Sequence, residues 1–357
     1  MPLDLTASSA DLTRAICDIP SVSDDETALA DAIFEAVSAV PHLHVHRDGD
    51  AIVARTELGR AHRVVIAGHI DTVPVNDNLP TRMMTEDDES VIWGRGTVDM
   101  KAGVAVQLKL AAELSAPAVD VTWVWYDHEE VEATRNGLGR LERNSPELLA
   151  ADFAVLGEPT AGEVEGGCNG TLRAIVRTHG MRAHSARAWV GENAIHAAAP
   201  VLDTLAQYRP RTIVVDGLAY REGLNAVRIT GGVAGNVIPD QCEVEVNFRF
   251  APSRSVEEAI AHVRAVFDGY EVEITDRSPA ARPGLDAPLA QEFMRAVGGT
   301  AKPKYGWTDV ARFSALGVPA VNYGPGDALL AHHDEERVPV SQIERVERGL
   351  RAWLSGS

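Results

Sequence analysis

Short apolar runs alternate with helix-like segments through the first half of the chain, and this alternation restricts the fold more than any other feature. Three runs are apolar enough to be buried strands: Val64–Ala67, Val121–Tyr126 and Phe153–Leu156. Between two of them, Ala102–Leu114 has the periodicity of a helix. Buried strands separated by helices are typical of a mostly parallel sheet covered by helices. We therefore predict an α/β domain.

The pattern changes near residue 171, where apolar and polar residues alternate singly, as in half-exposed strands. The clearest such segments are Leu172–Thr178 and Glu243–Phe250, and amphipathic helices are predicted at Asn193–Gln207 and Val256–Phe267. These elements make a small α+β unit, after which the first pattern resumes. We therefore predict that an inserted domain interrupts the α/β domain, with boundaries at 1–170, 171–278 and 279–357.

Composition narrows the possible partners and the compartment. The chain has 33 basic and 52 acidic residues, a formal net charge of −19, so its surface repels nucleic acid and anionic lipid. No stretch reaches the roughly 18 apolar residues of a membrane span, and the N-terminus does not resemble a signal peptide. Three widely separated cysteines suit a reducing compartment. We expect a cytoplasmic protein that binds neither nucleic acid nor membrane, in which any metal is held by histidines and carboxylates.

The first polar motif, GHIDTVP at 68–74, closes a predicted strand. Residues two apart on a strand face the same way, so His69 and Asp71 point together. This suits a metal-bound imidazole whose other ring nitrogen is held by a carboxylate. By itself, the motif also fits a surface turn in which Asp71 caps a neighbouring segment.

Two further motifs supply carboxylates. In WGRGTVDMKAG at 93–103, glycines surround Asp99 before a predicted helix, without the Lys-Ser/Thr ending of a phosphate-binding loop. In DHEEVEATRNG at 127–137, Glu129 and Glu130 follow a buried strand, where ligands bind in open α/β sheets, although acidic runs are usually solvated surface. Asp99 could thus bridge two cations, while one glutamate binds metal and the other acts on a water.

Two weaker motifs complete the set. LGEPT at 156–160 follows another apolar strand and offers Glu158, and GPGDALLAHHDEERV at 324–338 offers His332 or His333. Two histidines with several carboxylates form a ligand set that zinc, cobalt or manganese accepts. Together the five segments predict a metal centre.

In their order along the chain, these motifs resemble a family of dinuclear zinc metallopeptidases and deacylases that includes acetylornithine deacetylase, aminoacylases and glutamate carboxypeptidase. The resemblance spans nearly the whole chain. It implies a zinc-peptidase-like catalytic domain with a mixed, mostly parallel sheet, and an inserted α+β lid that also serves dimerisation. It further implies two zinc ions per subunit, with cobalt able to substitute.

The resemblance implies a role for each metal ligand. Asp99 would bridge both ions, His69 and Glu158 would complete one site, and Glu130 and His332 the other. We choose His332 over His333 because its spacing to a following glutamate, HxxxE, resembles the closing motif of the family. A cis peptide bond after Asp99 is also implied.

The resemblance also implies catalytic and lid residues. Glu129 would be the general base and Asp71 would orient His69. In GMRAHSA at 180–186, His184 matches a histidine that reaches across a homodimer into the partner's site, although a surface histidine is the plainer interpretation. In GNVIP at 235–239, Asn236 is a candidate substrate contact.

Substrate specificity depends on other residues. Arg249 matches a family arginine that contacts a substrate carboxylate, although a solvated strand arginine is an equal alternative. The segment 306–332, with Thr308, Asp309 and Arg312, resembles most the actinobacterial succinyl-diaminopimelate desuccinylases in this family. One departure is GCNGTLR, where better-known desuccinylases have the arginine-rich NGRRGS.

We therefore expect hydrolysis of N-succinyl-LL-2,6-diaminopimelate to succinate and LL-2,6-diaminopimelate, a step toward lysine and cell-wall precursors. One alternative is acetylornithine deacetylase or a related N-acyl-amino-acid amidohydrolase. Another is a non-catalytic metal-binding scaffold on the same fold. Glu129 separates this last alternative from an enzyme, because metal binding needs the five ligands but not this glutamate.

Overall fold

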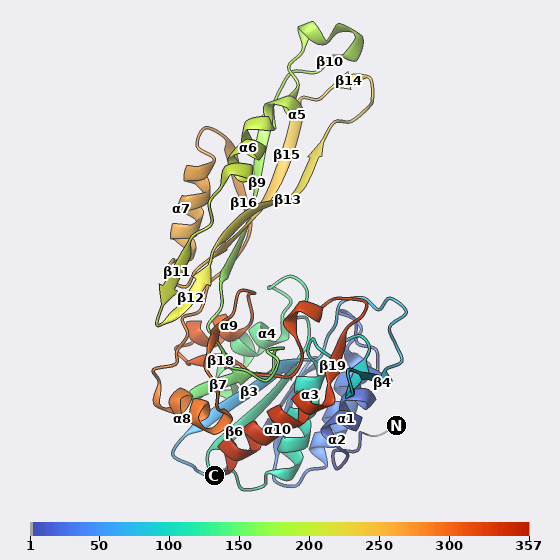
Figure 1. Ribbon diagram of the computed structural model, residues 1–357, viewed down its shortest axis with the longest axis vertical. Coiled ribbons are helices and arrows are strands. Elements are labelled where there is room, and N and C mark those ends of the chain that lie inside the picture. Colours follow the sequence, from blue (N-terminus) through green and yellow to red (C-terminus); the bar gives the residue numbers. More distant parts are fainter. Residues whose placement is uncertain (1–2, 357) are drawn as a thin grey trace. The chain divides into compact units, whose positions relative to one another are not determined.

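The computed structural model describes residues 3–356, which form two compact units (Figure 1). The first unit comprises the chain up to Gly166, Gly284–Lys302 and the chain from Arg312 onward, and the second comprises Gly167–Pro283 and Pro303–Ala311. No helix within residues 3–356 has the length and apolar content needed to cross a bilayer.

The unit boundaries differ from the predicted ones because of backbone pairing. Cys168 and Ala281 exchange two N–H to O hydrogen bonds of 3.1 Å, and the Asn169 N–H donates to the Lys304 carbonyl at 3.2 Å. These contacts join the segments 167–170, 279–283 and 303–311 to the second unit. The predicted boundaries had assigned all three segments to the first domain.

The first unit is built on a mixed sheet of eight strands. Its centre is parallel, because β3 (Arg63–His69) pairs in parallel with both β6 (Asp120–Tyr126) and β7 (Phe153–Leu156), and β7 with β18 (Ala320–Asn322). All seven residues of β6 are buried. The mixed α/β sheet expected from the sequence is confirmed, but parallel pairing is limited to its centre, because β1 with β2, β2 with β6 and β18 with β8 pair antiparallel. In spatial order the strands are β1 (His44–Asp48), β2 (Ala51–Arg55), β6 (Asp120–Tyr126), β3 (Arg63–His69), β7 (Phe153–Leu156), β18 (Ala320–Asn322), β8 (Glu165–Gly166) and β17 (Lys302–Pro303).

Helices pack on this sheet and share one apolar core with it. They are α1 (Ser9–Cys17), α2 (Thr27–Ser38), α3 (Lys101–Glu113), α8 (Pro288–Val297) and α10 (Val340–Ser355). The unit also contains α4 (Gly137–Asn144) and the 3-10 turns η1 (Pro146–Leu148) and η3 (Ala328–Leu330), and α9 (Val310–Ala315) spans a unit boundary. Because the central strands are parallel, the segments that follow β3, β6 and β7 meet at one edge of the sheet.

A small sheet brings two distant loops to that edge. It consists of β19 (Arg337–Pro339), β5 (Glu89–Trp93) and β4 (Arg82–Glu86), in this spatial order. Pairing of β19 with β5 places the segment before β19 next to the glycine-rich loop after β5, where the Gly94 N–H donates to the Glu336 carbonyl at 2.9 Å.

The second unit is a four-stranded antiparallel sheet with helices on one face (Figure 1). In spatial order the strands are β13 (Gly223–Gly231), β15 (Gln241–Phe250), β9 (Gly170–His179) and β16 (Glu271–Ser278). The helices are α5 (Ala194–Ala197), α6 (Ala199–Gln207) and α7 (Val256–Val266). Two short ribbons pair β10 (Ala183–His184) with β14 (Val237–Ile238) and β11 (Thr212–Val215) with β12 (Leu218–Arg221), and the 3-10 segment η2 spans Ser185–Val190.

One predicted helix is divided in the structure. The segment expected to be continuous over Asn193–Gln207 forms α5 and α6, with a break at Ala198. The second helix has a proline in its first turn, and a proline has no N–H with which to continue the bonding of the preceding helix.

Candidate metal centre

The first predicted ligand pair lies at the end of β3. His69 is buried, and its Nδ1 lies 3.0 Å from the main-chain oxygen of Asp71 and 3.4 Å from the Asp71 carboxylate. Its Nε2 lies 3.1 Å from an oxygen of Asp99. The main-chain oxygen is therefore a closer partner of the ring than the carboxylate that the sequence motif suggested.

Asp99 faces both histidines of the cluster. Its Oδ1 lies 3.1 Å from Nε2 of His69, and its Oδ2 lies 3.3 Å from Nε2 of His332. The peptide bond between Asp99 and Met100 is cis, as the resemblance implies. A carboxylate whose two oxygens each lie near a different imidazole is suited to bridge two cations.

Of the two adjacent histidines, His332 reaches the cluster. Its Nε2 lies 2.9 Å from Oε1 of Glu130, and its backbone adopts a positive φ of 64°. The ring of His333 instead accepts a hydrogen bond from the Glu335 N–H at 3.1 Å, within its own loop. The left-handed turn at His332 sends the two neighbouring rings to different places.

Glu158 follows β7 and also belongs to the cluster. A ligand atom of Glu158 lies within 4.8 Å of those of His69 and Asp99. Its loop packs against the first turn of α3, where a Cβ on Gly103 would lie 2.3 Å from the Gly157 carbonyl oxygen. The absence of a side chain at Gly103 permits this close approach.

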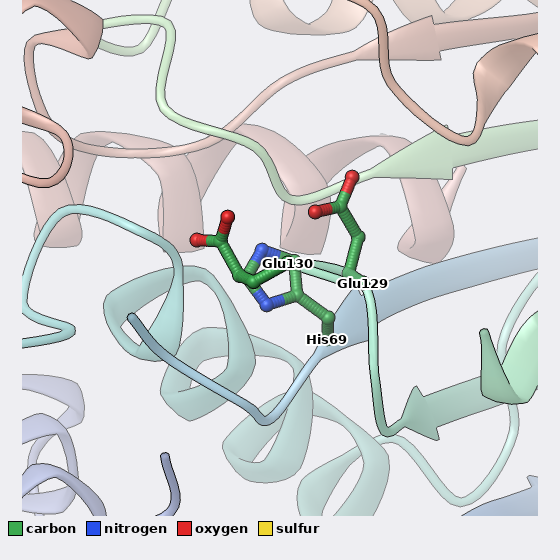
Figure 2. A group of neighbouring side chains, drawn as sticks. All are labelled: His69, Glu129 and Glu130. Carbon is green, nitrogen blue, oxygen red and sulfur yellow. The ribbon is translucent and has the colours of Figure 1, made fainter. Parts of the chain in front are cut away.

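The carboxylate of Asp71 organises the loop that carries the two glutamates. It is fully buried and accepts hydrogen bonds from the Glu129 N–H at 3.0 Å, the Glu130 N–H at 3.1 Å and the Ser23 hydroxyl at 2.7 Å. Figure 2 shows the outcome: the carboxylates of Glu129 and Glu130 lie on either side of the His69 ring. Asp71 therefore fixes the backbone from which both glutamates project.

Glu336 has the same function for the loop that carries Asp99. It is buried and accepts hydrogen bonds from the Val98 N–H at 2.8 Å and the Asp99 N–H at 3.0 Å, while Arg95 balances its charge at 2.9 Å. From the sequence, this glutamate served only to choose between two histidines. Its spacing after His332 was the one signal that it belongs to the site, and nothing in the sequence marked Ser23.

The donor set fits two cations. Among the described residues, three groups of three side chains have their ligand atoms within 4.8 Å of one another: His69, Asp99 and Glu158; Asp99, Glu130 and His332; and His69, Glu129 and Glu130. The first two groups share Asp99, and each contributes one imidazole and two carboxylates. So many carboxylates repel one another unless positive charge lies among them. The chemistry of the donors therefore fits a pair of divalent metal ions.

The carboxylates also perturb the histidines. Burial disfavours the imidazolium of His69, but its hydrogen bonds to Asp71 and Asp99 outweigh burial and raise its pKa well above the usual value. Hydrogen bonds to Asp99 and Glu130 raise the pKa of His332 to about 10. Protons and metal ions therefore compete for both rings at neutral pH.

Four predicted residues lie in the second unit. His184 is exposed, and its Nδ1 accepts a hydrogen bond from the Ala186 N–H at 3.1 Å. Asn236 lies beside it, because its carbonyl accepts from the Ser185 N–H at 2.9 Å. Arg249 projects from β15, and Thr308 is buried, with its carbonyl 3.7 Å from the Cys168 thiol. Their functional roles stay predictions.

Comparison with known proteins places the chain in a family. Residues 65–355 match the model of peptidase family M20/M25/M40. The chain belongs to this peptidase family. Metal binding and hydrolysis are thus expected of the family fold, in agreement with the paired ligand groups.

Two relatives in the family match over nearly their full length. DapE of Mycobacterium tuberculosis is 53% identical over 357 residues, which cover 99% of this chain and 100% of the relative. A protein of Corynebacterium glutamicum named succinyl-diaminopimelate desuccinylase is 46% identical over 364 residues, 99% of this chain and 98% of the relative.

Solved structures in the family share the fold. A tripeptidase from Staphylococcus aureus matches with a TM-score of 0.79 at 21% identity, covering 99% of each chain. A metallo-carboxypeptidase from Sulfolobus solfataricus matches with a TM-score of 0.78 at 17% identity, covering 98% of this chain and 99% of the other.

Metal binding should release protons, and the release should depend on His332 but not on His333. A ligating imidazole must be neutral, whereas the raised pKa values keep both clustered histidines protonated at pH 7 when metal is removed. Adding zinc to chelator-stripped protein in weakly buffered indicator dye measures the release. We expect His332→Ala to release about one proton fewer than the unsubstituted protein, because one raised pKa is lost.

His333→Ala is the matched control and should release as many protons as the unsubstituted protein. Apparent metal affinity should also increase as the pH rises toward the pKa of His332, since fewer protons then compete. A loss of proton release confined to His333→Ala would contradict the assignment.

Proposed function

We propose that this protein is a metal-dependent amidohydrolase that converts N-succinyl-LL-2,6-diaminopimelate to succinate and LL-2,6-diaminopimelate. The observation that carries the chemistry is the pair of ligand groups sharing Asp99, with the carboxylate of Glu129 beside them. The substrate assignment is supported by the 46% identical relative named for this activity. It also agrees with the resemblance of the segment 306–332.

The metal site that we propose holds two zinc ions per subunit, with cobalt as a possible substitute. His69 and Glu158 would hold one ion, Glu130 and His332 the other, and Asp99 both. Nitrogen and carboxylate donors of this kind suit zinc. When bound, such ions supply Lewis acidity, which polarises an amide carbonyl and makes a water molecule more acidic.

Glu129 is the residue that we propose as general base. Its N–H is held by Asp71, and its carboxylate lies within 4.8 Å of ligand atoms of His69 and Glu130. It is not among the five metal ligands that we propose above. Glu129 would take a proton from the attacking water and return it to the leaving amine.

We propose that four residues of the second unit contact the substrate: His184, Asn236, Arg249 and Thr308. Because Nδ1 of His184 accepts a hydrogen bond, the neutral ring carries its proton on Nε2. That N–H can donate to an oxyanion that forms during amide attack. Arg249 offers a guanidinium to a carboxylate.

We also propose a cytoplasmic homodimer that assembles through the second unit. The edge strand β13 exposes Val227 and Ile229, and Ile195 and Leu202 on the helices of this unit are also exposed. An edge strand with exposed apolar side chains is prone to pair with another chain. Three free and buried cysteines agree with a reducing compartment.

Substrate preference tests the proposed reaction. We expect zinc-loaded protein to hydrolyse N-succinyl-LL-2,6-diaminopimelate with a kcat/KM at least tenfold above that for N-acetylornithine, because the succinyl group carries a carboxylate and the acetyl group carries none. Release of free amine measures both rates in parallel. A clear preference for acetylornithine would assign the protein to the deacetylases instead.

Replacing Glu129 separates a catalyst from a metal-binding scaffold. We expect Glu129→Gln to retain two metal ions and to lose a factor of about 10² to 10⁴ in kcat, the usual contribution of a positioned base. Glu132→Gln is the matched control, because Glu132 is exposed on the same loop. Metal content is measured by atomic emission and turnover by succinate release, and unchanged turnover would remove Glu129 as base.

A charged substitution on the edge strand β13 tests whether the protein forms the proposed dimer. We expect the unsubstituted protein to sediment as a dimer and Ile229→Lys to sediment as a monomer, because an ammonium would be buried at the interface. Val214→Lys, on the exposed strand β11, should remain dimeric. A monomeric unsubstituted protein would rule out the proposed dimer.

A further inference from the structure

One face of the sheet in the second unit is free of helices and carries a pair of arginines. Leu172 on β9 and Phe248 and Phe250 on β15 are buried in the core beneath the helices. Because successive side chains on a strand alternate in direction, Arg173 and Arg249 point to the opposite face. The register pairs Arg173 with Asn247 and Arg249 with Thr171, so the two arginines are diagonal neighbours.

A short chain of hydrogen bonds orients Arg249. Its Nε donates to Oδ1 of Asn247 at 3.1 Å, and Nδ2 of Asn247 donates to the Thr171 hydroxyl at 3.0 Å. Within residues 3–356, no carboxylate lies within 4.0 Å of Arg249, and no hydrogen bond involves its two terminal nitrogens. The planar fork of the guanidinium is therefore held in place and available.

Arg173 is nearly as weakly paired. In the described chain, its Nε lies 4.0 Å from the carboxylate of Asp276, and its side chain is 54% exposed. Burial and the neighbouring charge of Arg173 both lower the pKa of Arg249. Two guanidiniums thus repel each other on this face, and Asp276 offsets that repulsion only in part, because the pKa of Arg249 stays lowered.

Another arginine on the same strand and face shows the contrast. Arg177 lies 2.8 Å from both Glu243 and Glu271, and it also pairs with Glu273. A chain with net charge −19 has many carboxylates to offer. Three of these carboxylates pair with Arg177, whereas Arg173 and Arg249 have no carboxylate closer than 4.0 Å within residues 3–356. This difference is expected where an external anion binds.

We propose that Arg173 and Arg249 together form the site for a substrate carboxylate, with Arg173 as a second arginine that determines specificity. This inference rests on the proposed function, because it takes the substrate to be an N-acyl amino acid with several carboxylates. Two guanidinium forks with Asn247 and Thr171 between them match the planar, negatively charged, two-oxygen acceptor that a carboxylate presents.

Kinetics with two substrates test the role of Arg173 in the zinc-loaded protein. We expect Arg173→Ala to raise KM for N-succinyl-LL-2,6-diaminopimelate by roughly tenfold to a hundredfold while kcat changes little, because a charge-assisted hydrogen bond to a remote carboxylate acts mainly on binding. N-butyryl-LL-2,6-diaminopimelate lacks the distal carboxylate. If KM rises only for the succinyl substrate, the acyl carboxylate binds at the site. If KM rises equally for both substrates, a diaminopimelate carboxylate binds there.

Two control variants separate binding from structure. Arg228→Ala removes a positive charge from the neighbouring strand β13, and Asp276→Ala removes the carboxylate that lies 4.0 Å from Arg173. Both should leave KM near that of the unsubstituted protein. An unchanged KM in Arg173→Ala, or an equally large rise in KM in Asp276→Ala, would overturn the inference.

Product binding separates this inference from the proposed reaction. Calorimetric titration of the zinc-loaded protein with succinate and with LL-2,6-diaminopimelate requires no turnover. Weaker binding of either product to Arg173→Ala supports the site even if the unsubstituted protein fails to cleave the succinyl substrate, which would overturn the reaction alone. Unchanged binding of both products overturns the site.

Discussion

Repulsion among carboxylates is the constraint on which the metal centre depends. Asp71, Asp99, Glu129, Glu130 and Glu158 converge where the central parallel strands end, and two histidines stand among them. Held together in this way, the anions raise the free energy of the folded protein unless donors and cations compensate. The pKa of His332, raised to about 10, is one measure of that negative potential.

The protein compensates mainly with backbone N–H groups and with few buried cations. Asp71 accepts the amides of Glu129 and Glu130, and Glu336 accepts those of Val98 and Asp99. An amide dipole stabilises a carboxylate without neutralising it, so the negative potential needed to attract divalent ions is kept. Two buried cations do lie nearby: Arg95, which pairs with Glu336, and Lys101, whose charge is favoured by Glu336 and Asp71.

The sequence predicts the positions of the ligands better than the contacts that hold them. Strand-end motifs indicated His69, Glu130 and Glu158, because an apolar run followed by polar residues can be recognised in one segment. The bonds from Asp71 to Glu129 and Glu130 join residues 58 and 59 positions apart, and no local pattern encodes them. The unit boundaries escaped prediction for the same reason, since they depend on pairing between segments more than a hundred residues apart, such as Cys168 and Ala281.

Asp71 contacts three residues of the centre: His69, Glu129 and Glu130. Its main-chain oxygen meets the ring of His69, and its carboxylate sets the backbone of a proposed base and of a proposed ligand. Asp71 is therefore a common neighbour of His69, Glu129 and Glu130, and a substitution at any of the three changes the surroundings of Asp71. Their effects on activity should be strongly epistatic, so that the second substitution costs far less than the first. Natural sequences that vary at one of these positions would then be expected to vary at the others together.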